Sequence, residues 1–282
     1  MKYCYRGGNL LSSDGFDEVI LEKIKYEDFK TVEDITESCK PFGDKKIIFS
    51  IPNFNECINN NFLSLILNYC KESKNAEIRF GGITTNQEEI DIVLKVMKDY
   101  PEVSFFFQHY VDNWDTLIYF IQCGVKQVYI TQELGFDLAR VAEVCHEQNV
   151  LIRVFPNVAQ SQWDAIDDLR KFWIRPEDID LYEGYIDTIE FYGETERQAV
   201  YLDIYKKDKQ WAGNLQEIII GLNTEINSYY LLPRFGEYRI KCNKNCWKTN
   251  KCHICDRIIE LSKNLEENKI RLIEKEEEQK NG

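Results

Sequence analysis

The chain has 282 residues, a formal net charge of −13 and ten cysteines. The length suits a single α/β barrel of roughly 250 residues, and the negative charge argues against a nucleic-acid partner, whose phosphates it repels. No segment approaches the roughly 20 apolar residues of a membrane span, and no apolar stretch follows a basic region at the start. Without a secretion signal, the cysteines are expected to be thiols or metal ligands. We therefore expect a cytoplasmic protein that makes no membrane contact.

Short β-rich runs recur along the chain, each followed by a stretch of helical periodicity. Near the start, either KYCYR or DEVILE supplies one strand. The later runs are KKIIFSIPN, AEIRFGG, EVSFFFQH, KQVYITQEL, NVLIRVFPN, FWIRP and DTIEFYG. These runs are almost continuously apolar, which is typical of parallel strands covered on both faces.

Eight strand–helix units in this length predict a TIM-type (β/α)₈ barrel over residues 1–232. The alternative is an open doubly wound sheet, but no Gly-rich phosphate-binding turn follows the first strand. Residues 233–256 form a predicted Cys-rich extension, and residues 257–282 a charged helix and tail.

The Cys-rich extension carries four cysteines within fourteen residues, namely Cys242, Cys246, Cys252 and Cys255. Four thiolates at this spacing can close a tetrahedral zinc site or hold an iron–sulfur cluster, and ligand chemistry alone leaves both open. The radical-SAM pattern is excluded, because the third cysteine here comes ten residues after the first. The other six cysteines are scattered in apolar contexts, as expected of reduced core residues.

Polar residues that close each predicted strand are candidates for a ligand site, because TIM barrels bind ligands at the carboxyl ends of their strands. They are Asn53, Arg79, His109, Glu133, Arg153, Asn157, Arg175 and Glu190. Glu190 lies among apolar residues and must find a partner or shift its pKa. An ion pair with Arg153 or Arg175 inside the barrel is the alternative to a catalytic role for either glutamate.

Two stretches and the cysteine run together resemble peptidase family U-32, the collagenase-like peptidases, whose relatives include hydroxylation proteins acting on ubiquinone precursors and ribosomal RNA. The stretches are YITQELGFDLARVAEVC and FWIRPEDIDLYEGYIDTIEFYGETERQAVYLDIY, and the resemblance covers roughly residues 76 to 255. It implies a TIM-type barrel and, as in the hydroxylase-like members, a four-iron cluster held by four cysteines. That favours iron–sulfur over zinc.

The chain also departs from this family. Where the peptidase members carry a His-Gly segment with nearby cysteines, this chain has RVFPNVAQSQW, which weakens the prediction of proteolysis. Asn157 and Gln160 in this segment suit hydrogen bonding to a small ligand, although loop solvation explains them equally well.

The leading hypothesis is a U-32-like barrel with an iron–sulfur cluster, which acts on a small or peptidic substrate by hydroxylation or a related modification. His109 and Glu133 are the candidates for proton transfer, and Arg153 and Arg175 for positioning an anionic group. A histidine that caps the next helix is the alternative for His109.

Two other functions stay open at this point. One is a non-catalytic adaptor barrel with a structural zinc site, in which the helix over 257–273 docks a protein partner through the apolar stripe Ile258, Leu261, Leu265 and Ile273. Packing of this stripe on the protein's own barrel is the commoner outcome. The other is a peptidase of the U-32 type.

Overall fold

The computed structural model describes most of the first 240 residues. The described residues are 1–7, 14–22, 29–51, 61–81, 87–107, 110–111, 113–131, 134–159, 171–206, 214–223, 226, 228, 231 and 235–240.

A single sheet of parallel strands forms the centre of the fold. Its strands are β1 (Lys2–Arg6), β2 (Glu18–Leu21), β3 (Lys46–Ile51), β4 (Ala76–Phe80), β5 (Ser104–Phe107), β6 (Tyr110–Val111), β7 (Gln127–Ile130), β8 (Leu151–Val154) and β9 (Thr188–Glu190). The order across the sheet is β5-β4-β3-β2-β1-β9-β8-β7-β6. Because β6 follows β5 in the chain after only two residues, the two act as one strand, and the sheet is a nearly closed eight-stranded barrel. The predicted fold class is confirmed.

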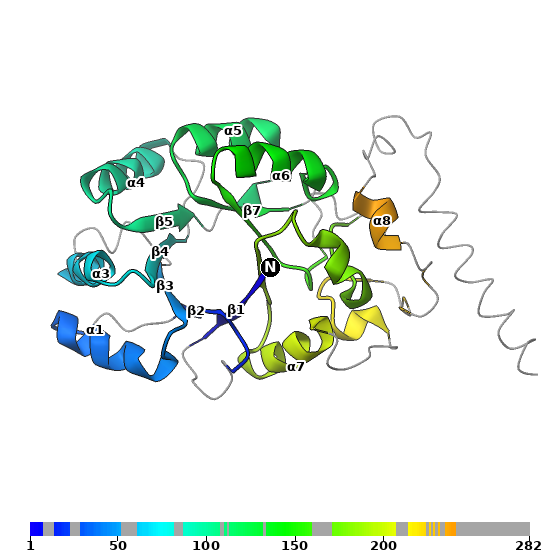
Figure 1. Ribbon diagram of the computed structural model, residues 1–282, viewed down its shortest axis with the longest axis horizontal. Helices are drawn as coiled ribbons and strands as arrows, with labels where there is room; N and C mark the ends of the chain where they lie inside the picture. Colours follow the sequence, from blue (N-terminus) through cyan, green and yellow to red (C-terminus); the bar gives the residue numbers. More distant parts are fainter. Residues whose placement is uncertain are drawn as a thin grey trace, which may run out of the picture.

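Helices surround the strands (Figure 1). They are α1 (Val32–Cys39), α3 (Asn61–Glu72), α4 (Gln87–Asp99), α5 (Trp114–Gln122), α6 (Leu138–Glu147) and α7 (Thr195–Tyr205), with α8 (Phe235–Ile240) outside the ring. Short 3₁₀ helices are η3 (Lys40–Phe42), η4 (Leu134–Phe136), η6 (Pro176–Tyr182) and η7 (Leu215–Glu217). None of the helices in the described ranges is long and apolar enough to cross a bilayer.

Local sequence explains where several of these elements begin. Thr31 caps α1 through a capping box with Asp34, in which each side chain accepts a hydrogen bond from the other residue's backbone. Asn113 caps α5 by accepting a hydrogen bond from the backbone of Thr116. Both caps satisfy backbone N–H groups that a helix leaves free at its start.

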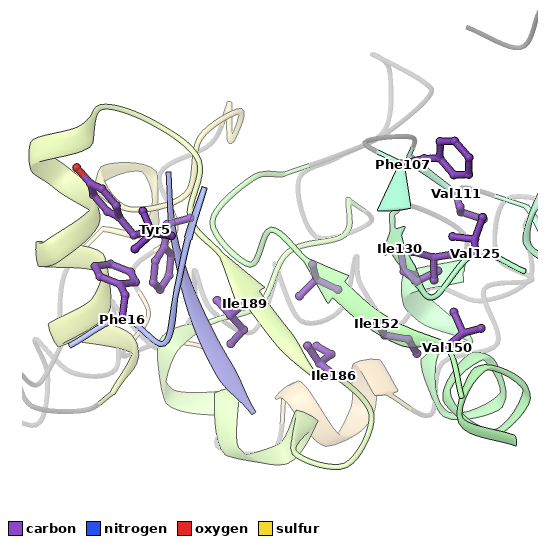
Figure 2. Close-up of a cluster of buried hydrophobic side chains, with 14 of the residues drawn as sticks. Tyr5, Phe16, Phe107, Val111, Val125, Ile130, Val150, Ile152, Ile186 and Ile189 are labelled. Atoms are coloured by element: carbon purple, nitrogen blue, oxygen red, sulfur yellow. The ribbon is translucent and has the colours of Figure 1, made fainter. Parts of the chain in front are cut away.

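Successive side chains along each strand point to opposite faces of the sheet, so the apolar side chains form two layers. The outer layer fills the space between strands and helices, and Figure 2 shows part of it, with Ile130, Ile152 and Ile189 on three neighbouring strands. The inner layer is smaller and lies inside the barrel. It consists of Cys4, Ile20, Ile48, Phe106, Tyr129 and Phe155.

The strand prediction was wrong at two places, and the total of eight strands is unchanged because one error adds a strand and the other removes one. KYCYR and DEVILE both form strands, β1 and β2, which pair with each other. FWIRP is not a strand, because β8 pairs directly with β9 and leaves no position between them. This segment instead buries Trp173 against Phe235 of α8, with ring centroids 5.7 Å apart, and it ends in Pro176, which lacks the N–H that a sheet needs.

Candidate functional site

The interior of the barrel is crossed by a network of charged and polar side chains. Its fully or almost fully buried members are Glu18, Glu77, Arg79, Gln127, Arg153 and Glu190. A buried charge is costly unless it is paired and hydrogen-bonded. The network therefore has to be closed within itself or at the mouth of the barrel.

Arg153 lies at the centre of this network. Its Nη2 is 2.5 Å from Glu18 Oε2 and its Nη1 is 3.4 Å from Glu190 Oε2, while Nε donates to Gln127 Oε1 at 3.0 Å. Burial by itself raises the pKa of Glu18, but Arg153, Lys46 and Lys2 together lower it by more, so this carboxyl is ionised at neutral pH. The Arg153–Glu190 ion pair foreseen as the alternative for Glu190 is present. Catalytic positioning by Arg153 stays a prediction.

Arg79 connects the interior to the mouth of the barrel. Its Nη1 donates to Glu190 Oε1 and to the Tyr129 hydroxyl, both at 3.1 Å. Its Nη2 donates to Glu22 Oε1 at 2.6 Å and to Ser50 Oγ at 2.9 Å. Arg79 is fully buried, whereas 27% of the Glu22 side chain is exposed. Glu22 therefore presents the outer end of a chain of ion pairs to solvent.

Tyr129 completes the inner part of this chain. Its hydroxyl donates to Glu190 Oε2 at 2.7 Å. Burial and the neighbouring Glu190 raise the pKa of Tyr129 well above its ordinary value, so the phenol stays protonated. Glu190 is thus held by Tyr129, Arg79 and Arg153 together, and its carboxylate has a fixed orientation.

A pocket of about 620 Å³ opens at the carboxyl end of strands β1, β2 and β9. TIM barrels carry their active sites at this end. We call it the mouth pocket. It is lined by Arg6, Gly7, Glu22, Tyr192, Gly193, Glu194, Thr195, Glu196 and Gln198.

The Arg6–Glu22 ion pair forms a fixed wall of the mouth pocket. Arg6 Nε and Nη2 both donate to Glu22 Oε1, at 3.1 and 2.5 Å. The guanidinium carbon lies 5.8 Å from the ring centre of Phe155 and 5.4 Å from that of Tyr192. Burial raises the pKa of Glu22, but Arg6 and Arg79 lower it by more, so Glu22 is a carboxylate at neutral pH.

Two buried carboxamide side chains hold the backbone on either side of this wall. Gln198 of α7 accepts from the Arg6 N–H at 2.8 Å and donates to the Arg6 carbonyl at 2.9 Å. Asn157 does the same for Tyr192, accepting at 3.0 Å and donating at 2.7 Å. Asn157, which the sequence offered as a ligand for a small molecule, uses both ends of its amide inside the protein. The two amides fix Arg6 and Tyr192 relative to each other through the strands that carry them.

Arg175 lies apart from both the network and the mouth pocket. It precedes η6 and forms a two-pronged ion pair with Asp178, with Nη2–Oδ1 2.7 Å and Nε–Oδ2 2.8 Å. Its guanidinium carbon lies 5.8 Å from the Phe235 ring of α8. Among the described residues, neither Arg175 nor Arg153 lines the mouth pocket.

The remaining predicted site residues lie outside the described residues. These are Asn53, His109, Glu133, Gln160 and the cysteines Cys242, Cys246, Cys252 and Cys255. Within the described part of the chain, no group of three or more His, Cys, Asp or Glu side chains is arranged to hold a metal ion. The described cysteines are free, and four of the five are buried.

Arg6, Glu22, Tyr192 and Gln198 were not predicted as site residues. A signal for the first two was present, because Arg6 closes KYCYR and Glu22 closes DEVILE. Because the sequence did not decide which of the two runs is the first strand, it did not single out either residue. Gln198 offered no such signal, since a glutamine on a helix looks like an ordinary surface residue.

Comparison with known proteins gives similarity in fold alone. No family model matches the sequence, and no curated protein does. One solved structure with local similarity is a mutant of FabK from Thermotoga maritima, with 13% identity and a TM-score of 0.41 over 70% of this chain and 62% of that chain. A second is a glycerophosphodiester phosphodiesterase from Parabacteroides distasonis, with 10% identity and a TM-score of 0.46 over 74% of this chain and 98% of that chain. A third is D-allulose 3-epimerase from Methylomonas sp., with 7% identity and a TM-score of 0.42 over 74% of this chain and 96% of that chain. The match thus spans less than two thirds of the FabK chain. All three scores are below 0.5, so the fold assignment rests on the strand pairing itself.

Proposed function

We propose that this chain is an enzyme of the U-32 type that binds a small or peptidic substrate in the mouth pocket and modifies it by hydroxylation or a related reaction. One observation carries the proposal: a pocket at the carboxyl end of the barrel has a wall made of an ion pair, Arg6–Glu22, that is anchored to buried charges. Fixed charges at the edge of a pocket orient a polar ligand without reorganisation when it binds.

The proposal assigns binding and chemistry to different residues. Glu22 and Tyr192 contact the substrate in the mouth pocket. His109 and Glu133 are proposed for proton transfer, and in the sequence they follow β5 and β7 within three residues. The carboxyl ends of parallel barrel strands meet at one rim, which is the same end as the mouth pocket. Arg153 acts from the interior by orienting Glu190.

We further propose that Cys242, Cys246, Cys252 and Cys255 hold an iron–sulfur cluster. Four thiolates are the usual donor set for such a cluster. When bound, the cluster supplies electron transfer. The described cysteines are no competing ligand set, because Cys4, Cys39, Cys70 and Cys145 are buried and burial raises the pKa of each thiol.

The cofactor is tested by metal analysis of protein purified without oxygen. We expect about four iron and four acid-labile sulfide per chain, with visible absorption of a cluster. Cys252→Ser should lower both contents strongly, whereas Cys123→Ser, outside the cysteine run and half-buried, should leave them unchanged. Stoichiometric zinc without iron or sulfide would refute the cluster and favour the adaptor barrel.

The enzymatic part is tested separately with the same preparation. Cluster-loaded protein is incubated with mixtures of small metabolites and short peptides and with an oxidant that supplies the oxygen atom of a hydroxylation, and products are sought by mass spectrometry. A change in substrate mass that disappears in Glu22→Gln but persists in Glu143→Gln is the expected result. Glu143 is a residue of α6 outside the mouth pocket. A product formed equally by both variants contradicts the assignment of the mouth pocket.

A further inference from the structure

The lining of the mouth pocket carries more negative than positive charge. It contains one arginine, Arg6, and three glutamates, Glu22, Glu194 and Glu196. The charge of Arg6 is already matched, since Nη2 is 2.5 Å from Glu22 and Nε is 3.4 Å from Glu190. Glu194 and Glu196 are exposed at the start of α7, and neither is in an ion pair with a described residue. The described lining therefore carries a net negative charge, which attracts cations.

Glu22 offers one oxygen of its carboxylate to a ligand. All three hydrogen bonds that it accepts from described residues reach Oε1, two from Arg6 and one from Arg79. Oε2 accepts none from the described residues, and the side chain is 27% exposed. Because Arg6 and Arg79 lower the pKa of Glu22 overall, the open oxygen carries charge at neutral pH. A carboxylate held in this way is suited to accept a hydrogen bond from a cationic donor.

An aromatic ring lies beside Arg6 in the same pocket. Tyr192 lines the pocket, its ring is contacted by Arg6, and 45% of the residue is exposed. An exposed tyrosine ring attracts ammonium groups and packs against the carbon skeleton of a small ligand. The ring thus adds a second contact of a different kind.

An anionic ligand fits this arrangement poorly. It would have to compete with Glu22 and Glu190 for Arg6, and it would lie close to Glu194 and Glu196 at the start of α7. Arg6 Nη1 has no hydrogen-bond partner in the described structure, but this atom is buried and offers no surface to a ligand that enters the pocket. The carboxylates that face the pocket are acceptors.

We infer that the mouth pocket binds a small organic cation, with its ammonium group on Glu22 Oε2 and its carbon skeleton against Tyr192. Glu194 and Glu196 add long-range attraction. This inference rests on the proposed function, in which the mouth pocket is the substrate site, and it narrows the substrate to molecules with a free amino group.

Three probes with one skeleton and different charge test the inference. They are L-alaninamide, a cation; N-acetyl-L-alaninamide, which is neutral; and N-acetyl-L-alanine, an anion. Binding to the anaerobically purified full chain is measured by calorimetry at low ionic strength. We expect the cation to bind at least about tenfold more tightly than the neutral probe, with a preference that falls as salt is added.

Matched variants locate the binding. Glu22→Gln should weaken binding of L-alaninamide at least about tenfold, whereas Glu143→Gln on α6 should leave it unchanged. Because Glu22 also forms an ion pair with Arg79, a second variant, Glu194→Gln/Glu196→Gln, changes only exposed residues. It should weaken binding of L-alaninamide about two- to fivefold without loss of stability.

Two results would overturn the inference. Tighter binding of N-acetyl-L-alanine than of L-alaninamide refutes the cationic substrate class, and if that binding still depends on Glu22 the proposed site itself survives. Cation binding that is unaffected by both variants, or no binding of the cation at all, also refutes the inference. The mass-spectrometric comparison of Glu22→Gln with Glu143→Gln then decides independently whether the mouth pocket is the substrate site.

Discussion

Replacing Arg153 by methionine should cost more stability than any surface change, and the contacts of its two carboxylate partners set the size of the loss. Glu190 keeps its ion pair with Arg79, in which Arg79 Nη1 lies 3.1 Å from Glu190 Oε1, when Arg153 is removed. Glu18, only 2% exposed, keeps two lysines at 3.6 and 3.9 Å and loses its contact at 2.5 Å. One carboxylate is therefore left poorly paired, and we expect a loss of about 3–5 kcal/mol in the free energy of unfolding.

The loss should depend on pH in a defined direction. In the parent protein burial raises the pKa of Glu18, but Arg153, Lys46 and Lys2 together lower it by more, so the net pKa lies below the ordinary value of 4.5. A lowered pKa gives stability that is present above the unfolded pKa and disappears as the pH falls through the folded pKa. Without Arg153, burial dominates and the pKa of Glu18 rises, so its carboxyl becomes protonated at a higher pH. The deficit of the variant should then be largest near pH 7 and smaller near pH 5.

Urea unfolding followed by tryptophan fluorescence at both pH values measures these differences. Arg140→Met is the matched control, because Arg140 is 68% exposed on α6, and it should change the free energy of unfolding by less than about 0.5 kcal/mol. A loss below about 1 kcal/mol for Arg153→Met at pH 7, or a larger deficit at pH 5, would refute the reasoning about the buried carboxylates.

Three further outcomes follow from the described contacts. Gln198→Leu leaves the N–H and the carbonyl of Arg6 without their partners, and urea unfolding should show a loss of about 2–4 kcal/mol; an unchanged midpoint would mean that water replaces the amide. Thr31→Ala removes the cap of α1 and should cost about 1 kcal/mol in the same assay, whereas a neutral result would show that the cap is redundant. Burial raises the pKa of Cys70 well above its ordinary value, so iodoacetamide should modify half-buried Cys123 before Cys70 in the folded protein; peptide mass spectrometry that finds Cys70 labelled first would contradict this.

Strand positions could be predicted from the sequence because the strands are nearly continuous apolar runs, such as KKIIFSIPN and KQVYITQEL. Local hydrophobicity could not separate FWIRP from a true strand, since its apolar residues are buried equally well without forming a strand of the sheet. Trp173 is fully buried and packs on Phe235 of α8. The burial of a segment can thus be predicted from its apolar composition, whereas its pairing in the sheet depends on which strands have a free edge.

The charged interior was predicted in part. The pairing of Glu190 with Arg153 follows from the cost of burying either charge alone. The role of Arg79 as a link between Glu190 and Glu22 could not be predicted, because these residues are 111 and 57 positions away from it in the chain. Their contact depends on the strand register around the nearly closed ring, which no local pattern encodes.

Closure of the ring depends on the ladder between β1 and β9, in which Lys2 pairs with Thr188 and Cys4 with Glu190. This ladder joins the two ends of the barrel sequence, and contacts between residues so far apart form slowly because a long loop must be closed first. The mouth pocket lies across this junction, with Arg6 on one side and Tyr192 on the other. A folding intermediate that has formed β2 to β8 but not this ladder contains most of the secondary structure and no ligand site. Acquisition of ligand binding during refolding should therefore lag behind helix formation and report the moment at which the ring closes.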